Sequence, residues 1–141
     1  MTEEDRKLLL KDLSARLPYG VKIALKNNGS YHHDNVAKKG DITIDRLKGF
    51  NGNYFSIRHT NPLDWDWYDD DIDIEDIKPY LFPLSSMTEE QKEEFDRLYT
   101  YDALIIEPQW KLIDWLNKNH FDYRGLIPMG LAIDATNKNI Y

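Results

Sequence analysis

The sequence predicts one α+β domain, spanning residues 1–141, with an N-terminal helix, an antiparallel sheet of three or four strands, two C-terminal helices and a docked tail. Three observations predict this class. Leucines recur at helical spacing in the first seventeen residues, apolar and polar residues alternate between about residues 21 and 60, and helical spacing returns after residue 88. Strands grouped between helices are typical of α+β folds, and the sheet is expected to be open or barrel-like.

The first helix is predicted over residues 2–17. Thr2 stands at the N-cap position, and acidic residues fill the turn that follows it. Leucines at positions 9, 10, 13 and 17 share one face, and Pro18 ends the helix.

Three strands are predicted next, over residues 21–26, 41–47 and 54–60. Residues 27–30 form the first turn, and residues 48–53, with Gly49 and Gly52, form a hairpin connection. Residues 77–83 contain Pro79 and Pro83, which indicate a short helical turn or an extended connection.

The C-terminal third is predicted to contain two helices and an ordered tail. Thr88 and Gln91 fit a capping box that begins a helix over residues 88–99. Pro108 suits the first turn of a second helix, which ends near His120. Four residues of this helix have the spacing of a partner-binding face or, more usually, of a core face: Trp110, Ile113, Trp115 and Leu116. We expect the core face. Four apolar residues are expected to dock the tail from Arg124 to Tyr141: Leu126, Ile127, Leu131 and Ile133.

Composition excludes several classes of function. The absence of cysteine excludes thiol catalysis, thiolate metal sites and disulfides. A sequence pI near 5.0 argues against broad binding to nucleic acid or anionic membrane. No apolar run approaches the ~20 residues that span a bilayer, and the acidic N-terminus is unlike a secretory signal. We therefore expect a soluble cytoplasmic protein with no direct nucleic-acid or membrane partner and no cofactor.

The most unusual feature is an acidic and aromatic run from Asp64 to Asp76, here called the acidic run. It contains eight carboxylates and no basic residue, and outside it 17 acidic residues face 18 basic ones. The net charge of −7 therefore arises entirely from the run, because the rest of the chain is close to neutral. The residues expected to contact a partner are Asp64, Trp65, Asp66, Trp67, Tyr68, Asp69, Asp71, Asp73 and Glu75.

Three interpretations of the acidic run are open. Carboxylates at positions 69, 71 and 73 have the spacing of calcium ligands, but the sixth position lacks glycine and Tyr80 replaces the bidentate Glu at the twelfth. Regularly spaced carboxylates with aromatic neighbours suit mimicry of nucleic acid in a basic groove. The third interpretation is a solvated strand, with Ile72 and Ile74 facing the core and the carboxylates facing water.

Histidines and a cluster near the C-terminus offer two further candidates. His32, His33 and Asp34 lie together, but a metal site would need His59 or His120 as a third ligand. A second cluster, His120, Asp122, Tyr123 and Arg124, contains groups for proton transfer and anion binding, and with Arg58 it is an alternative ligand site. We favour a structural role for this cluster, since His suits a helix C-terminus, Asp122 and Arg124 can pair across a turn, and Gly125 can take a positive φ.

Three stretches of the chain have distinctive sequences. They are residues 8–22 (LLLKDLSARLPYGVK), 77–91 (IKPYLFPLSSMTEEQ) and 120–132 (HFDYRGLIPMGLA). Together they resemble a family of small uncharacterised proteins encoded by phages and prophages of gut Bacteroidetes. The resemblance implies a phage setting and supplies no catalytic residue.

The sequence predicts a non-catalytic phage-type accessory protein that binds a host protein. Its sharper form is inhibition of a nucleic-acid-handling or defence factor through the acidic run. The alternative is a protein that binds and sequesters a nucleotide or signalling molecule, with aromatic residues stacking a base and Arg58 or Arg124 holding phosphate. An enzyme would need two or more histidines to converge on a carboxylate, and no catalytic motif is present.

Overall fold

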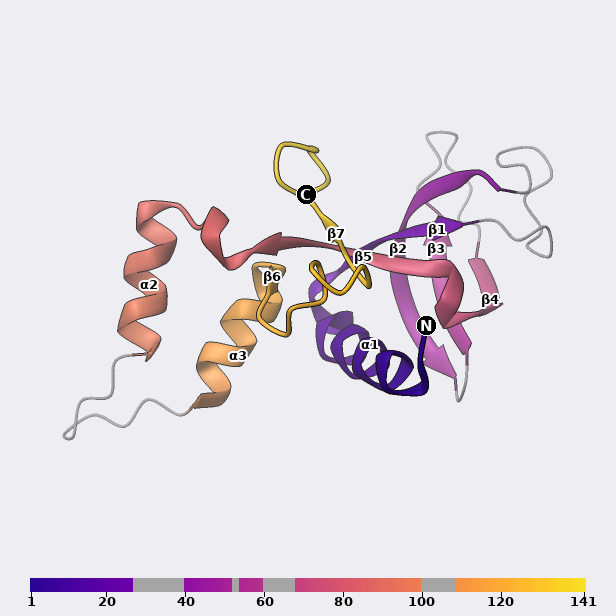
Figure 1. Ribbon diagram of the computed structural model, residues 1–141, viewed down its shortest axis with the longest axis horizontal. Helices are drawn as coiled ribbons and strands as arrows, with labels where there is room; N and C mark the ends of the chain where they lie inside the picture. The colour runs from indigo at the N-terminus through magenta and orange to yellow at the C-terminus, as the bar shows by residue number, and fades with distance from the viewer. Residues whose placement is uncertain (27–39, 52–53, 60–67, 100–108) are drawn as a thin grey trace.

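The computed structural model describes residues 1–26, 40–51, 54–59, 68–99 and 109–141. For residues 50, 51, 54, 56–59 and 68–71 it describes the backbone alone. The predicted α+β class is confirmed. Helix α1 (Glu3–Arg16) precedes a mixed sheet that does not close on itself, and helices α2 (Glu89–Tyr99) and α3 (Gln109–Lys118) follow (Figure 1).

The order of the strands in the sheet is β4-β3-β2-β1-β5-β6, and β7 also pairs with β5. The strands are β1 (Lys22–Lys26), β2 (Ile42–Asn51), β3 (Tyr54–His59), β4 (Tyr68–Ile72), β5 (Ile77–Pro83), β6 (Phe121–Asp122) and β7 (Ile133–Asp134). Neighbours from β4 to β5 are antiparallel, whereas the two-residue strands β6 and β7 run parallel to β5. These parallel pairings attach the C-terminal tail to the sheet.

Helix α1 begins as the sequence predicts. The Asp5 amide donates to Thr2 Oγ1 at 3.1 Å, and the Thr2 amide donates to the Asp5 carboxylate at 2.9 Å, which completes a capping box. The helix packs Leu9 and Leu13, both fully buried, into the main core. Burying each leucine contributes roughly 1.5–3 kcal/mol, so packing on the sheet holds α1 in place.

Strand β5 differs from the sequence prediction. It is a seven-residue strand, and its first half pairs with β1, through Ile23 opposite Pro79 and Leu25 opposite Ile77. Its second half pairs with β7 and β6. Proline cannot donate a ladder hydrogen bond and usually argues against a strand interior, which is why the sequence pattern missed this element.

Strand β2 is longer than predicted. It continues from Ile42 to Asn51, with an irregularity in its pairing to β3 between Leu47 and Gly49. The hairpin connection therefore begins later than the expected residue 48.

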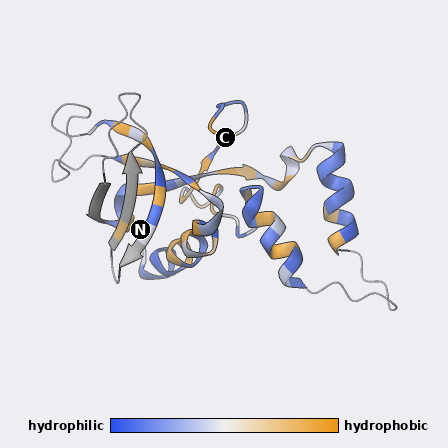
Figure 2. Cartoon of the chain, turned by 180° about the vertical axis from the view of Figure 1, so that it is seen from behind, coloured by the Kyte–Doolittle hydropathy of each residue, from blue (hydrophilic) through white to orange (hydrophobic). Residues whose placement is uncertain are grey.

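The hairpin of α2 and α3 lies at the opposite end of the molecule from β4 (Figure 1). The capping box of Thr88 and Gln91 is present, and α2 buries no residue. In Figure 2, α2 is correspondingly mostly hydrophilic.

The expected core face of α3 is wrong in part. Leu116 is 3 % exposed, but Trp110 is 62 % exposed and Ile113 is 39 % exposed. The buried residues of α3, Leu116 and Asn117, lie in its last turn, and Trp110 lies in its first turn.

The tail docks as predicted. Leu126 and Leu131 are buried in the main core, and Ile127 and Ile133 are half-buried against the two core clusters. Three single 3₁₀ turns complete the described structure: η1 (Leu17–Tyr19), η2 (Ile74–Asp76) and η3 (Leu84–Ser86). None of the helices described here has the length and apolar character needed to cross a membrane.

Candidate functional site

The acidic run forms an edge of the sheet. Residues 64–67, including Trp65 and Trp67, lie outside the described residues, and residues 68–72 form β4. Within the described chain β4 is the last strand of the sheet and pairs only with β3, where Ile57 is opposite Asp69 and Arg58 is opposite Tyr68. An edge strand has one row of backbone donors and acceptors that the sheet does not use. The run thus contributes a strand, as one of its interpretations predicted.

Two isoleucines attach the acidic run to the core. Ile72 is fully buried and Ile74 is 7 % exposed, as the alternation of the sequence predicts. Their burial fixes the register of β4, because a shift by one residue would place carboxylates in the core.

The C-terminal part of the run is held by α1. Arg6 forms an ion pair with Glu75 and lies 3.9 Å from an Asp73 oxygen, and Asp73 Oδ1 accepts a hydrogen bond from the Glu75 amide at 3.1 Å. Both carboxylates remain about half exposed. Asp73 and Glu75 were expected to contact a partner, but the structure gives them an internal role as well. The residues of β4 before them are better candidates for a partner contact.

His120 sits at the turn after α3. Its φ of 60° lies in the left-handed region, and its carbonyl accepts a hydrogen bond from the Phe82 amide at 2.8 Å. The imidazole stacks on Tyr141, with 3.7 Å between ring centroids and 11° between ring planes. Burial, followed by the charges of Arg16 and Lys22, lowers the pKa of His120 to about 4. The ring is therefore neutral at pH 7 and part of the tail's packing.

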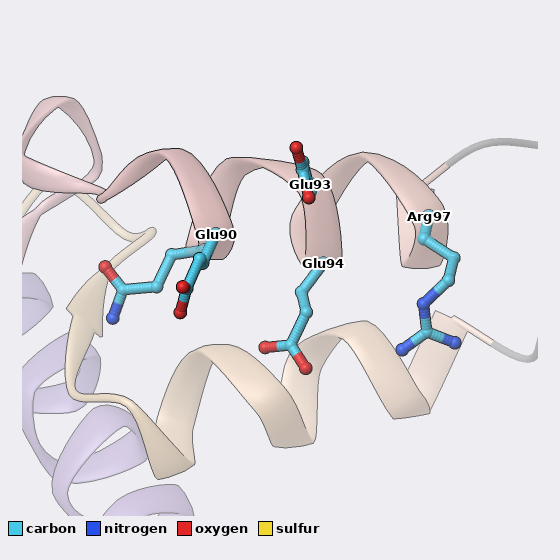
Figure 3. A pocket seen from close by; sticks show the side chains of 5 residues that line it. Glu90, Glu93, Glu94 and Arg97 are labelled. Atoms are coloured by element: carbon cyan, nitrogen blue, oxygen red, sulfur yellow. The ribbon is translucent and has the colours of Figure 1, made fainter.

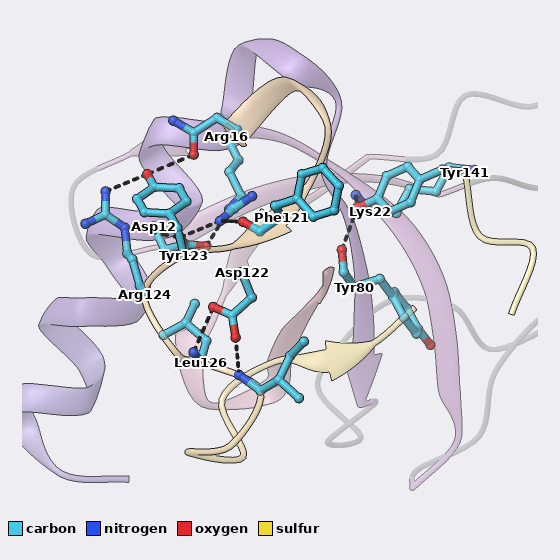
Figure 4. A network of polar contacts seen from close by, with 12 residues as sticks. Asp12, Arg16, Lys22, Tyr80, Phe121, Asp122, Tyr123, Arg124, Leu126 and Tyr141 are labelled. Carbon is cyan, nitrogen blue, oxygen red and sulfur yellow. Dashed lines mark hydrogen bonds and ion pairs between the residues drawn. The ribbon is translucent and has the colours of Figure 1, made fainter. Parts of the chain in front are cut away.

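Tyr141 carries the second half of this contact. Its hydroxyl donates to the Tyr80 carbonyl at 2.8 Å and accepts from the Lys22 amide at 3.1 Å (Figure 4). Burial raises the pKa of this hydroxyl well above its ordinary value, although the residue as a whole is 44 % exposed. The stacked pair joins the turn after α3 to β1 and β5.

Asp122 does not pair with Arg124, contrary to the sequence-based expectation. Its carboxylate accepts hydrogen bonds from the Leu126 and Ile127 amides, at 2.9 and 2.8 Å. This contact orders the turn at Gly125, whose φ of 75° confirms the expected positive angle. Asp122 is 7 % exposed, and a buried carboxylate needs hydrogen-bond donors. The two backbone amides supply them inside the fold.

Arg124 instead joins a buried polar network that the sequence analysis missed. Arg16 binds Asp12 through Nε at 2.7 Å and Nη2 at 3.0 Å, and Nη2 also donates to the Phe121 carbonyl at 2.7 Å. Arg124 Nε lies 3.2 Å from the same Asp12 carboxylate, as an electrostatic contact without hydrogen-bond alignment. Two guanidinium groups thus share one buried carboxylate, in the region drawn in Figure 4.

Tyr123 extends this network toward α3. Its hydroxyl donates to Asn117 Oδ1 and accepts from Arg124 Nη2, both at 2.9 Å. The Arg16 and Arg124 guanidinium groups lie over its ring, 5.3 and 4.7 Å from the centroid. Of the four clustered residues predicted from sequence, three therefore hold the tail, and His120 stacks beside them.

The other predicted site residues do not join this cluster. Arg58 lies in β3, and β2, β1 and β5 separate that strand from β6. His32, His33 and Asp34 lie outside the described residues, whereas His59 belongs to β3. Within the parts of the chain that the structure describes, no three His, Asp or Glu side chains are arranged to hold a metal ion.

A shallow hollow lies beside α2. Figure 3 shows its lining, with Glu94 directed toward α3 and Glu93 directed away from it; the lining residues are Glu90, Gln91, Glu93, Glu94 and Arg97. Glu94 accepts a hydrogen bond from Trp115 Nε1 at 2.9 Å, which ties the two helices together. Charged residues on an exposed helix are typical of a solvated face, and we assign no site here.

Comparison with known proteins gives no assignment: no family model, no curated protein and no solved structure matches this chain. The resemblance to phage-encoded proteins is therefore still a prediction. The acidic strand β4, whose backbone pairs only with β3 within the described sheet, is the candidate site for a partner.

Proposed function

We propose that this protein is a non-catalytic binding protein that engages a basic surface of a partner protein through the acidic run. The observation that carries the proposal is the position of β4 at the edge of the sheet, with Ile72 and Ile74 anchored in the core. Anchoring holds the backbone of the strand in one register, which fixes the positions of residues 69–71 along the edge of the sheet. Complementary charge at such spacing speeds association and selects the partner.

The partner in this proposal is a host protein with a basic groove, such as a nucleic-acid-handling or defence factor, and the setting is the cytoplasm of a phage host. Support comes from the eight carboxylates of the run, without which the rest of the chain would be close to neutral, with 17 acidic and 18 basic residues. Trp65, Trp67 and Tyr68 would add aromatic anchors, which dominate the energy of many interfaces.

The nucleotide-binding alternative gains no support at the tail. Asp122, Tyr123 and Arg124 are already committed to contacts within the fold, and Arg58 lies on a distant strand. It is kept as a second proposal, which an equilibrium-dialysis screen of nucleotides would test.

The experiment that tests the first proposal is affinity capture from host lysate with three forms of the protein. The variant Asp69→Asn, Asp70→Asn and Asp71→Asn removes charge from β4 but leaves the Arg6 contacts of Asp73 and Glu75 intact. The control Glu3→Gln, Glu4→Gln and Glu90→Gln removes the same charge from exposed helical positions. A partner retained by the wild type and the control but lost with the β4 variant supports the proposal. Equal capture by all three forms contradicts it.

A further inference from the structure

Three cationic residues occupy directly opposed positions on neighbouring strands. Lys22 of β1 is opposite Arg46 of β2, and Arg46 is opposite Arg58 of β3. Tyr68 of β4 holds the next position in the same row. Like charges directly opposite each other destabilise a sheet, so a row of three cations is costly unless an anion compensates it.

The row belongs to the face of the sheet turned away from the main core. Ile23 and its partner Asp45, which alternate with the row, are both buried. The same alternation places Lys26 opposite Ile42 and Ala24 opposite both Ile44 and Lys78 on the outer face. We define the cationic face as Lys22, Lys26, Arg46 and Lys78, with Ile42 and Ile44 between them.

Most of the cationic face is open to solvent. Arg46, Lys26 and Lys78 are exposed, Ile42 is 65 % exposed and Ile44 is 44 % exposed. Within the described chain, the tail covers the neighbourhood of Ala24, which packs with Tyr80, Ala135 and Ile140, and it also contacts Lys22. No carboxylate occupies an outward position of β1, of β2 from Ile42 to Arg46, or of β5. In a chain of net charge −7, this is a local reversal of sign.

The charged groups of this face are largely unused within the described fold. Arg46, Lys26 and Lys78 form no hydrogen bond or ion pair through their side chains with any residue that the structure describes. Lys22 Nζ donates to the Ile140 carbonyl at 2.5 Å and keeps its charge near the Tyr141 ring. The Arg46 guanidinium lies against Gly20, where a Cβ atom would be 2.6 Å from Nη2. A guanidinium seated on a glycine and without an anionic partner is suited to bind one.

We propose that the cationic face binds the phosphate backbone of a short single-stranded nucleic acid. Guanidinium and ammonium groups are the usual ligands of phosphate in proteins. Neighbouring strands lie about 4.8 Å apart, so a row across β1, β2 and β3 covers roughly 10 Å. Ile42 and Ile44, both exposed on this face, offer apolar contact to bases.

The acidic run limits the length of this ligand. It begins at the edge strand next to β3, so a longer strand or a duplex that crosses β3 would meet the carboxylates of β4. The proposal therefore specifies a short segment, and it predicts that the β4 variant Asp69→Asn, Asp70→Asn and Asp71→Asn binds oligonucleotide more tightly. This surface is separate from the protein contact proposed at β4, and either proposal can fail alone.

The test measures fluorescence anisotropy of a labelled oligothymidylate of about eight nucleotides, a length within the range that single sheet-based domains bind. The variants are Arg46→Gln with Lys78→Gln, and Lys26→Gln with Lys78→Gln, which keeps the contact at Gly20. The control is Lys7→Gln with Lys11→Gln, which removes the same amount of charge from two exposed residues of α1. Circular dichroism checks that each variant is folded.

Both cationic-face variants are expected to bind the oligonucleotide at least ~10-fold more weakly than the wild type. The slope of log K against log salt concentration should be smaller in magnitude by about 1 to 2. The affinity of the control should stay within about twofold of the wild type. Absence of wild-type binding at low salt, or equal weakening by the control, would overturn the proposal. So would a polyglutamate peptide of equal charge that competes as well as unlabelled oligonucleotide, since the face would then recognise acidic protein.

Discussion

Asp12 and Arg16 form a two-point ion pair one helical turn apart, and both side chains are completely buried. Arg124 lies against the same carboxylate, so the cluster contains two cations and one anion. Losing one partner of a buried pair is costly because the remaining charge is left without compensation. The asymmetry of the cluster therefore determines which loss costs more.

Asp12→Asn is expected to destabilise the protein by about 3–5 kcal/mol, because both guanidinium groups then lose their only carboxylate in the described fold. Arg16→Met is expected to cost less, about 1–3 kcal/mol, because Arg124 still compensates Asp12. Urea denaturation of both variants measures the difference. Equal losses, or a larger loss for Arg16→Met, would show that Arg124 does not share the carboxylate.

The pH dependence of stability is expected to report His120. Its pKa is about 4 in the folded protein and 6.5 ordinarily, so the unfolded chain binds more protons between these values. The contribution of the neutral His120 to the free energy of unfolding is fully present above pH 6.5 and is lost as the pH falls to about 4. After allowance for its partial exposure, the loss is about 2 kcal/mol.

His120→Asn removes this titration and tolerates the left-handed backbone at position 120. The difference in unfolding free energy between wild type and variant should shrink from pH 7 to pH 4. A difference that is constant across this range would mean that His120 titrates normally in the folded state.

Tyr141→Phe keeps the ring that stacks on His120 but removes the hydroxyl contacts to Tyr80 and Lys22. It is expected to cost about 1 kcal/mol and to leave the pKa of His120 low. Tyr141→Ala opens the stack to water, so the pKa of His120 should rise toward 6.5, as measured by NMR titration of the imidazole. An unchanged His120 pKa in the alanine variant would contradict the role of the ring in its burial.

The two capping boxes are expected to behave differently. Thr2→Ala should lower the global unfolding free energy by about 1 kcal/mol, because α1 carries Leu9 and Leu13 into the core. Thr88→Ala should instead fray α2 locally, since this helix buries no residue. Hydrogen exchange resolves the two cases. Equal loss of global stability would show that α2 unfolds together with the rest of the domain.

The sequence predicts elements whose signals are local. The capping boxes at Thr2 and Thr88 and the alternation of Ile72 and Ile74 all appear in the structure, because a few neighbouring residues determine them. Strand β5 was missed because prolines are normally excluded from strand interiors. Asp12 and Arg16 have the spacing of an ordinary surface pair, and spacing does not reveal that the tail buries them.

The cationic face was missed for a related reason. Lys22, Arg46 and Lys78 are far apart in the sequence, and the register of β1 with β2 and β5 brings them to one face. The composition shows an acidic chain with a net charge of −7, and from this charge we expected no nucleic-acid partner. A charge pattern that depends on strand pairing is invisible to net charge.

The central claim, that β4 engages a basic partner, is tested most directly by capture from host lysate at stepped salt concentrations. The wild type is compared with the variant Asp69→Asn, Asp70→Asn and Asp71→Asn. We predict that the partner is lost from the wild type as salt rises, and that at low salt the variant captures at least ~10-fold less of it. Equal capture by both proteins at every salt concentration would contradict the account and leave β4 as a solvated edge.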